Sequence, residues 1–221
     1  MAGMGGTLVV NEIYTTLQGE GTRAGRPCTI VRLTGCNLRC RWCDTTYAYD
    51  EGREMPLADV LAEVRRRARH LVLVTGGEPL IQPTTPELLS CLCDAGHEVL
   101  LETNGSQDIS AVDGRVARCM DVKCPGSGQA GSLLRSNLEA LRAGDEVKFV
   151  LADRADYEYA RGVIAGHRLA ERCAVVLTPA AGWLAPARLA EWMLADAELP
   201  EGVRLGLQLH KILWPDRRRG V

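Results

Sequence analysis

The chain has 221 residues, of which 46% are hydrophobic, enough to build one domain with a full core. A net charge of −2 gives no sign of attraction to nucleic acid or a membrane surface, and no stretch approaches the ~18 apolar residues of a membrane span. The glycine-rich start, Met1 to Gly6, lacks the charged-then-apolar plan of a signal peptide, so we expect a cytoplasmic protein.

Strand and helix patterns alternate along the chain. Short apolar runs, several of them apolar at both parities, predict parallel strands covered on both faces, at 29–33, 71–74, 98–101, 118–122, 146–151, 174–177 and 203–209. Amphipathic spacing predicts helices between them, at 57–68, 86–95, 133–143, 154–165 and 186–195. A further strand at 8–14 precedes them all.

This alternation predicts an α/β fold with a parallel sheet. The strands are fewer than the eight of a closed barrel, and the chain falls short of the ~250 residues of that fold. We therefore expect residues 1–221 to form a single domain, a partial (open) β/α barrel of about six parallel strands. An N-terminal strand extends it, and a short C-terminal tail follows, in which we expect Arg217 to Arg219 to be solvated.

Polar and glycine-rich segments follow the predicted strands. They are Gly35 to Asn37, Thr75 to Pro79, Glu102 to Ser106, Lys123 to Gly128, Thr178-Pro179 and His210-Lys211. Active sites of barrels and open α/β sheets lie at the carboxyl ends of their strands. The sequence therefore predicts a site at one rim of the fold.

Three cysteines, Cys36, Cys40 and Cys43, fall within eight residues directly after the strand at 29–33. A closed zinc site takes four protein ligands, and an iron–sulfur cube usually takes four cysteines. Three cysteines on a cube would leave one iron open to bind a small molecule. The alternative is a structural zinc site completed by Cys28, Cys124 or a histidine.

Two other features at this rim could bind a ligand. Gly76-Gly77 lets the backbone approach a ligand closely, because glycine has no Cβ. Asp44-Thr45 offers oxygen atoms that could bind Mg²⁺.

Three cations lie in or at the end of apolar strands, at Arg32, Lys123 and Lys148. Charged groups in buried strands need partners. Those partners are either structural carboxylates, for which Glu102 and Glu146 are candidates, or an anionic ligand inside the barrel.

The cysteine spacing and the glycine motif together resemble the radical S-adenosylmethionine (SAM) superfamily. In that superfamily the open iron chelates the amino and carboxylate groups of SAM, and the reduced cluster cleaves SAM to a 5′-deoxyadenosyl radical. Trp42 matches the aromatic residue that often lies near the SAM adenine. The resemblance implies a barrel of the radical SAM type.

Nearly the whole chain resembles one family of this superfamily, the 7-carboxy-7-deazaguanine synthases. The similar segments, in chain order, are Tyr14 to Gly21, Ala24 to Pro27, Cys36 to Thr45, Thr75 to Gln82, Glu102 to Ser106, Asp121 to Gly128 and Gln208 to Lys211. The resemblance implies conversion of 6-carboxy-5,6,7,8-tetrahydropterin to 7-carboxy-7-deazaguanine with loss of ammonia, in queuosine and deazapurine biosynthesis. It also implies a 4Fe-4S cluster, SAM as a regenerated cofactor, Mg²⁺, a homodimer, and an electron donor such as flavodoxin or ferredoxin.

The resemblance assigns residues to each ligand. Cys36, Cys40 and Cys43 would hold the cluster, and Thr45 would bind Mg²⁺. The substrate would contact Leu17, Gln18, Gly19, Arg32, Thr75, Glu102 and Asn104. SAM would contact Gly77, Lys123, Cys124, Pro125, Thr178, Pro179, Ala180 and Ala181.

Two other functions remain open at this point. A glycyl-radical-enzyme activase shares the cysteine spacing and a glycine motif, but it acts on a protein partner. A structural zinc-binding module is the alternative that is not an enzyme.

Overall fold

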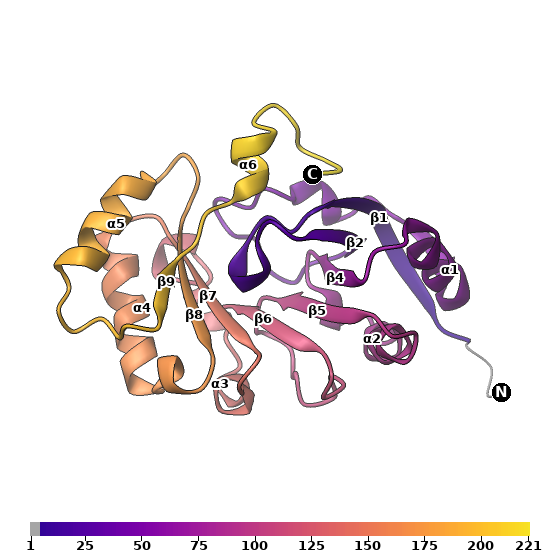
Figure 1. The fold of residues 1–221 in the computed structure, drawn as a ribbon, viewed down its shortest axis with the longest axis horizontal. Helices are drawn as coiled ribbons and strands as arrows, with labels where there is room; N and C mark the ends of the chain where they lie inside the picture. The colour runs from indigo at the N-terminus through magenta and orange to yellow at the C-terminus, as the bar shows by residue number, and fades with distance from the viewer. Residues whose placement is uncertain (1–4) are drawn as a thin grey trace.

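The computed structural model describes residues 5–221, which form one curved nine-stranded sheet with helices packed around it (Figure 1). The strand order is β3-β1-β2-β4-β5-β6-β7-β8-β9. The strands are β1 (Thr7–Leu17), β2 (Pro27–Leu33), β3 (Arg53–Pro56), β4 (Leu71–Gly76), β5 (Glu98–Thr103), β6 (Ala117–Asp121), β7 (Glu146–Leu151), β8 (Ala174–Pro179) and β9 (Val203–Leu205).

Each neighbouring pair is parallel along the part of the sheet ordered β2-β4-β5-β6-β7-β8-β9. Strand β1 pairs antiparallel with both β2 and β3. Strands β3 and β9 are the two edges of the sheet, so the barrel is open. The prediction of an open α/β barrel with an N-terminal strand is confirmed, although seven strands are parallel rather than about six. The sequence pattern missed β3, because its four residues include only one buried side chain, that of Met55.

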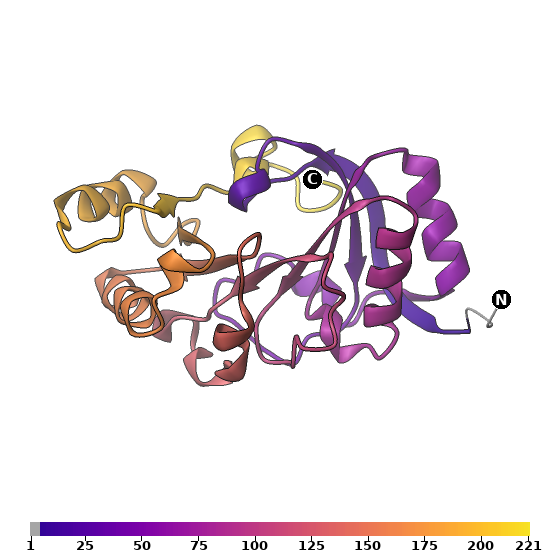
Figure 2. The same ribbon diagram turned by 60° about the horizontal axis from the view of Figure 1, so that its bottom comes forward.

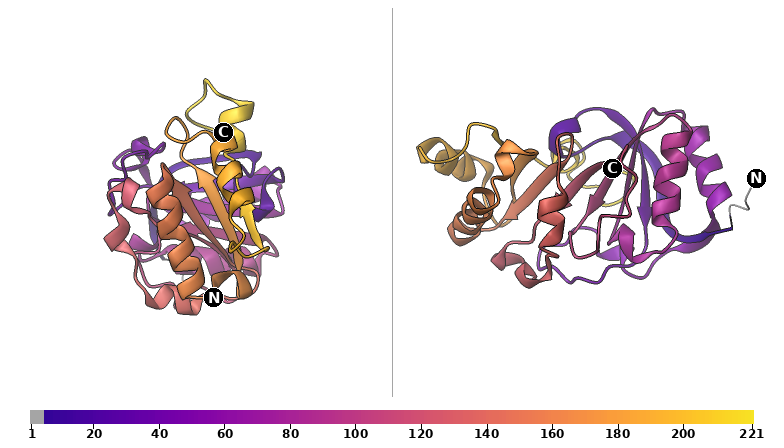
Figure 3. Two further views of the ribbon diagram at one scale, coloured as in Figure 1. Left: turned by 90° about the vertical axis from the view of Figure 1, so that its left-hand side faces the viewer. Right: turned by 90° about the horizontal axis from the view of Figure 1, so that it is seen from below.

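Five helices cover the outer face of the sheet: α1 (Leu57–Arg67), α2 (Thr85–Asp94), α3 (Ser136–Ala140), α4 (Arg154–Gly166) and α5 (Pro186–Ala195). Helices α1 and α2 lie side by side (Figure 3). A sixth helix, α6 (Leu209–Leu213), lies beside the N-terminal segment, where the Leu209 N–H donates to the Gly19 carbonyl at 2.9 Å (Figure 2). In residues 5–221 no helix is long and apolar enough to cross a membrane.

Three predicted elements were wrong in extent. The strand expected at 8–14 is longer and spans Thr7–Leu17. The helix expected at 133–143 shrinks to the five residues of α3, because Leu134 N and the Asn137 side chain bond to the Gly105 carbonyl and hold this segment in turns. The strand expected at 203–209 stops at Leu205. Gly206 then packs so closely on Val176 and Thr178 that a Cβ there would collide with them, and the chain turns into α6.

The two faces of each strand serve different purposes. Alternate side chains such as Val31, Val74 and Leu101 point outward and join the helices in the main core. The intervening side chains face inward, where Tyr14, Cys28, Ile30, Leu71, Leu73, Leu100 and Cys119 fill the end of the barrel nearer the strand starts. Each fully buried leucine or isoleucine contributes ~1.5–3 kcal/mol. The opposite end of the interior is left for polar side chains.

Candidate active site

A cavity of about 750 Å³ lies inside the curved sheet at the carboxyl ends of the parallel strands. This is the rim that the strand-end motifs predicted. Three other segments also line this cavity: the cysteine loop between β2 and β3, the N-terminal segment after β1, and α6 with the C-terminal residues that follow it. The cavity falls within the 300–1,000 Å³ range of ordinary small-molecule sites.

The inward-facing row of the strands becomes polar where it reaches the cavity. In each of four strands, a polar residue lies two positions after an apolar residue of the interior cluster. These pairs are Ile30 and Arg32, Leu73 and Thr75, Leu100 and Glu102, and Cys119 and Asp121. Lys148 on β7 is the fifth polar residue of this row. All five polar residues line the cavity. Side chains in a strand alternate between faces, so these residues reach the interior by the same period that builds the apolar cluster beneath them.

Cys36, Cys40 and Cys43 all line the same cavity and are all half-buried. Burial raises the pKa of both the Cys36 and Cys40 thiols, and the cation of Lys123 opposes that effect at each. Iron binding would convert these thiols to thiolates.

The backbone of the glycine motif fixes the start of the cysteine loop. Gly77 N donates to the Leu33 carbonyl at 3.3 Å, and Glu78 N donates to the Gly35 carbonyl at 2.8 Å. A Cβ on Gly77 would collide with Gly35 and with the Cys36 side chain. Glycine is therefore required where the two motifs meet.

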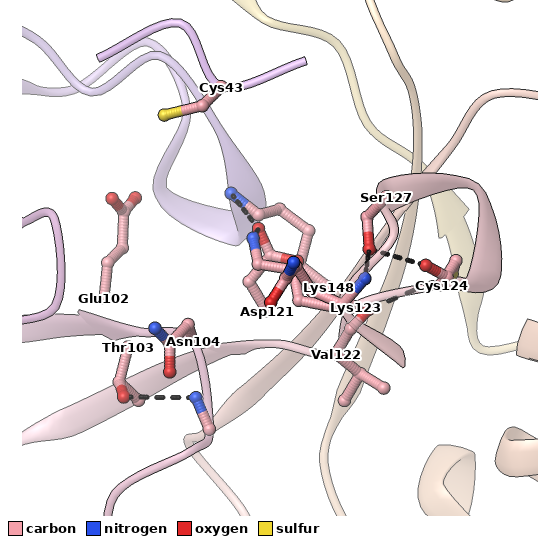
Figure 4. Close-up of polar contacts among 12 residues, drawn as sticks. Cys43, Glu102, Thr103, Asn104, Asp121, Val122, Lys123, Cys124, Ser127 and Lys148 are labelled. Carbon is pink, nitrogen blue, oxygen red and sulfur yellow. Dashed lines mark hydrogen bonds and ion pairs between the residues drawn. The ribbon is translucent and has the colours of Figure 1, made fainter. Parts of the chain in front are cut away.

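Neither Cys28 nor Cys124, the two cysteines considered as a fourth ligand, lines the cavity, whereas Cys119 and His210 do. Cys28 is fully buried in the interior apolar cluster, and burial raises its pKa to about 12. Cys124 is fully buried in the main core beside Ser127 and lies well apart from Cys43 (Figure 4). Within residues 5–221, no three His, Cys, Asp or Glu side chains converge as they would around a single metal ion. The positions of Cys28 and Cys124 therefore argue against either of them as the fourth ligand of a zinc site.

The cations of the interior have carboxylate partners other than the expected Glu102 and Glu146. Lys148 Nζ lies 2.6 Å from Glu20 Oε2 and 3.8 Å from Asp121 Oδ2, and Lys123 Nζ lies 2.8 Å from Asp121 Oδ2 (Figure 4). Burial opposes the charged form of both lysines, but the carboxylates outweigh it and raise the pKa of each. Glu146 instead bonds to Cys119 Sγ at 3.1 Å and to Thr22 N at 2.6 Å.

Arg32 also has an internal partner. Its Nε donates to Glu12 Oε1 on the neighbouring strand β1 at 2.9 Å, and its Nη2 donates to the Tyr14 hydroxyl at 2.9 Å. Of the two alternatives for this charge, the structural carboxylate is the one found, but it is Glu12 rather than Glu102 or Glu146. Arg32 still lines the cavity.

A chain of polar contacts joins α6 to the site. Glu20 Oε1 accepts from Gln208 Nε2 at 2.8 Å, and Gln208 Oε1 accepts from Lys211 Nζ at 2.8 Å. Lys211 Nζ lies 2.8 Å from Asp44 Oδ2, and His210 Nε2 lies 3.8 Å from the same oxygen. All five residues line the cavity. Asp44 was expected as a possible Mg²⁺ ligand and His210 and Lys211 belong to the expected strand-end segments, whereas Glu20 and Gln208 were assigned no role. The segments of the sequence that resemble the family contain all of them, which is the signal that could have identified them.

The structure brings together most of the predicted residues, but not all. The residues that line the cavity are Leu17, Gln18, Gly19, Arg32, Cys36, Cys40, Cys43, Thr45, Thr75, Gly77, Glu102, Asn104, Lys123, Ala180 and Ala181. Four predicted SAM contacts, Cys124, Pro125, Thr178 and Pro179, are not among the lining residues. The side chains of Cys124 and Thr178 are buried, and Pro179 borders a separate cavity of about 450 Å³.

Two further observations concern the mouth of the site. Trp42 packs edge-to-face against Trp183, with ring centroids 5.6 Å apart. Arg217, Arg218 and Arg219 line the cavity with exposed side chains, and Arg219 also bonds to Glu51 at 2.7 Å. The predicted solvated tail thus borders the site.

The comparisons with known proteins agree with this geometry. Residues 30–118 match the model of the radical SAM superfamily. A 7-carboxy-7-deazaguanine synthase from Koribacter versatilis is 43% identical over 96% of this chain and 99% of its own length. The enzyme of the same name from Chlorobaculum tepidum is 45% identical over 97% of each. The crystal structure of QueE from Escherichia coli superposes with a TM-score of 0.76 and 25% identity, over 92% of this chain and 95% of that one. The chain therefore belongs to the 7-carboxy-7-deazaguanine synthase family of the radical SAM superfamily.

Proposed function

We propose that this protein converts 6-carboxy-5,6,7,8-tetrahydropterin to 7-carboxy-7-deazaguanine with loss of ammonia, in queuosine and deazapurine biosynthesis. Family membership supports this reaction. The observation that carries the proposal is the convergence of three cysteines and a row of polar interior side chains on one cavity. A cavity of about 750 Å³ has room for a cofactor and a bicyclic substrate together.

Cys36, Cys40 and Cys43 would hold the 4Fe-4S cluster. When bound, the cluster and SAM supply the 5′-deoxyadenosyl radical that takes hydrogen from substrate C6 and later returns it. Gly77, Lys123, Ala180 and Ala181 lie on the cavity wall where they could contact SAM. Nothing in the cavity wall supports the SAM contacts expected of Cys124, Pro125, Thr178 and Pro179, since none of the four lines it.

The substrate would lie against the polar interior row. A pterin carries an amino group next to a ring N–H, and a carboxylate can accept both in parallel. Glu102 is placed for this role, because it lines the cavity and the donors Thr75 Oγ1 at 2.9 Å and Gln18 Nε2 at 3.4 Å, one to each oxygen, fix the plane of its carboxylate. Leu17, Gly19 and Asn104 complete this wall.

Arg32 would bind the substrate carboxylate. Its contacts with Glu12 and Tyr14 use only part of its N–H donors, and they fix the plane of the guanidinium. A fixed guanidinium can bind a carboxylate without a further loss of side-chain entropy.

Thr45 would bind Mg²⁺ through its hydroxyl. Its Oγ1 lies 3.8 Å from Cys43 Sγ, next to the cluster loop, and lines the cavity. The neighbouring Asp44 carboxylate is bonded to Lys211 and is engaged elsewhere. Substrate oxygens and water would complete the shell of this hard ion.

The family resemblance supports three further proposals. An electron donor such as flavodoxin or ferredoxin would reduce the cluster, and the exposed Arg39 and Arg41 on either side of Cys40 leave this loop accessible to a protein carrier. The enzyme would act as a homodimer, and its place would be the cytoplasm. Residues 1–221 would form one radical SAM domain.

Anaerobic reconstitution with iron and sulfide tests the proposal against its alternatives. The protein should load iron, and incubation with SAM, dithionite and carboxytetrahydropterin should yield a product with the mass of 7-carboxy-7-deazaguanine. The Cys40→Ala variant should yield none. A zinc-loaded protein without SAM cleavage would favour the structural module. SAM cleavage that ignores the pterin would favour an activase.

A further inference from the structure

Glu78 is a fully buried carboxylate that joins the ends of three strands. Its backbone N–H donates to the Gly35 carbonyl after β2 at 2.8 Å. Its side chain accepts from Leu80 N at 3.0 Å, from Thr103 Oγ1 at 2.9 and 3.0 Å, and from Asn104 N at 2.6 Å. The segment after β5 is therefore fixed relative to the start of the cysteine loop.

This arrangement determines which way the Asn104 amide points. Ser106 N donates to Asn104 Oδ1 at 2.9 Å, so the amide oxygen must face Ser106 and the amide nitrogen must face the cysteine loop. Asn104 Nδ2 donates to Asn37 Oδ1 at 3.2 Å and lies 4.0 Å from Cys36 Sγ. Asn37 Nδ2 in turn donates to Ser106 Oγ at 2.8 Å and closes the ring.

Cys36 Sγ thus has two N–H donors directed at it, from Leu38 N at 3.4 Å and from the Asn104 amide. Hydrogen bonds to the sulfurs of an iron–sulfur cluster are one of the means by which a protein sets its reduction potential. An N–H dipole stabilises the reduced cluster more than the oxidised one, because the reduced cluster carries one more negative charge. Each such bond therefore raises the potential.

We propose that Glu78 is a positioning residue that acts through Asn104, whose amide hydrogen bond to Cys36 raises the reduction potential of the cluster. The inference rests on the proposed function, since it requires a cluster on Cys36. It adds to Asn104 a role in cluster reduction beside its place on the substrate wall. Glu78 does not line the cavity and reaches the cluster only through the loop that it holds.

The test is an EPR-monitored redox titration of the reconstituted protein without substrate. Asn104→Leu keeps the approximate size and removes the donor, so the potential should become more negative than in the wild type. Gln107→Leu makes the same exchange in the same loop, and its amide bonds Ser106 Oγ at 3.4 Å rather than a cysteine. That control should keep the wild-type potential. An unchanged potential in Asn104→Leu, or an equal shift in Gln107→Leu, would overturn the proposal.

A double-mutant cycle with Glu78→Gln tests the positioning role. Loss of the Glu78 charge alone would make the reduction potential more positive, by the same amount in the wild type and in the Asn104→Leu variant. If Glu78 acts through Asn104, its substitution should also lose the amide bond in the wild-type background but not in Asn104→Leu. The two substitutions should then be non-additive, and strict additivity would contradict the relay.

Thr103→Val replaces Glu78→Gln in the cycle if that variant does not fold, because it removes a donor to the carboxylate and keeps the charge. Apo-protein unfolding and iron content identify folding failures separately from shifts in potential. A wild-type protein that forms no cluster would refute the proposed function. A wild-type protein that turns over, beside an Asn104→Leu variant of unchanged potential, would refute only this inference.

Discussion

The charged residues inside the barrel are held in pairs whose members come from distant parts of the chain. Lys148 on β7 meets Glu20, which follows β1, and Arg32 on β2 meets Glu12 on β1. A buried charge without a partner would cost several kcal/mol, whereas a pair that also accepts hydrogen bonds is tolerated. These pairs keep a polar cavity compatible with a stable fold.

Removing Lys148 should therefore be costly. Lys148→Met leaves Glu20 buried without its cation and should lower the free energy of unfolding by about 3–5 kcal/mol. Lys211→Met breaks a pair whose side chains are 32% and 40% exposed and should cost ~1 kcal/mol or less. Urea unfolding of both apo-proteins measures the difference. If both variants lost the same free energy of unfolding, the Glu20 carboxylate would be solvated rather than buried without a cation.

The three cavity cysteines should behave differently from the other thiols. Cys36→Ala, Cys40→Ala and Cys43→Ala should each abolish iron loading and SAM cleavage, because each sulfur would hold a different iron. Cys91→Ala and Cys173→Ala, which lie away from the cavity, should retain both. Iron content and 5′-deoxyadenosine release are the measurements. Loss of iron in a folded Cys124→Ala variant would indicate a fourth ligand and contradict the open iron.

Thr45 offers a test of the metal site. Thr45→Val keeps the shape of the side chain but removes the oxygen, so turnover should lose its stimulation by Mg²⁺ while the cluster spectrum stays unchanged. Thr45→Ser keeps the hydroxyl and should keep the stimulation. If Thr45→Val were stimulated as the wild type is, Thr45 would not be a ligand.

At the scale of elements, the N-terminal segment between β1 and β2 is clamped at both ends. Glu20 contacts Lys148 and Gln208 at the cavity, whereas Arg23 and Arg26 bind Glu98 at the start of β5, at 2.8 and 2.6 Å. The hydrogen bonds from Arg26, helped by those from Arg23 and opposed by partial burial, lower the pKa of Glu98 to about 2. The clamp holds the wall that carries the predicted substrate contacts.

This clamp predicts a pH dependence of stability. The pKa of Glu98 falls from 4.5 in the unfolded chain to about 2 in the fold, so its contribution is complete above pH 4.5 and is lost as the pH falls towards 2. Glu98→Gln should therefore lower the free energy of unfolding by about 1–3 kcal/mol at pH 7, with a smaller difference at pH 3. Urea unfolding across this range is the measurement. A difference that does not change with pH would exclude the ion pair as its cause.

At the scale of the whole molecule, local patterns were enough to predict most of the architecture. The strand–helix alternation located seven parallel strands and four of the outer helices, because runs such as the one in β4 depend only on neighbouring residues. The short elements β3, α3 and α6 depend on tertiary contacts, such as those from α6 to Gly19 and Glu20. No local pattern encodes such contacts.

The site was predictable in part for the same reason. The cysteine loop and the glycine motif are contiguous in sequence and could be recognised directly. Glu20, the partner of Lys148, lies 128 residues away in the sequence. Glu12, the partner of Arg32, lies opposite it on the antiparallel strand β1. Neither pair could be predicted before the fold was known. Glu78 was hidden within a recognised motif, because its role depends on the positions of Thr103 and Asn104.

The most direct test of the central claim follows one hydrogen atom. Carboxytetrahydropterin deuterated at C6 should be supplied to the reconstituted enzyme with limiting unlabelled SAM and dithionite. If this cavity generates the radical on SAM, abstraction of deuterium from C6 gives a 5′-deoxyadenosine whose methyl group carries one deuterium and two hydrogens. Return of one of these hydrogens to the rearranged substrate radical leaves the deuterium on the adenosyl carbon, so deuterium should appear in the recovered SAM. The number of product molecules should also exceed the number of SAM molecules. Product formation with no deuterium in SAM, or with one SAM consumed for each product, would contradict the account.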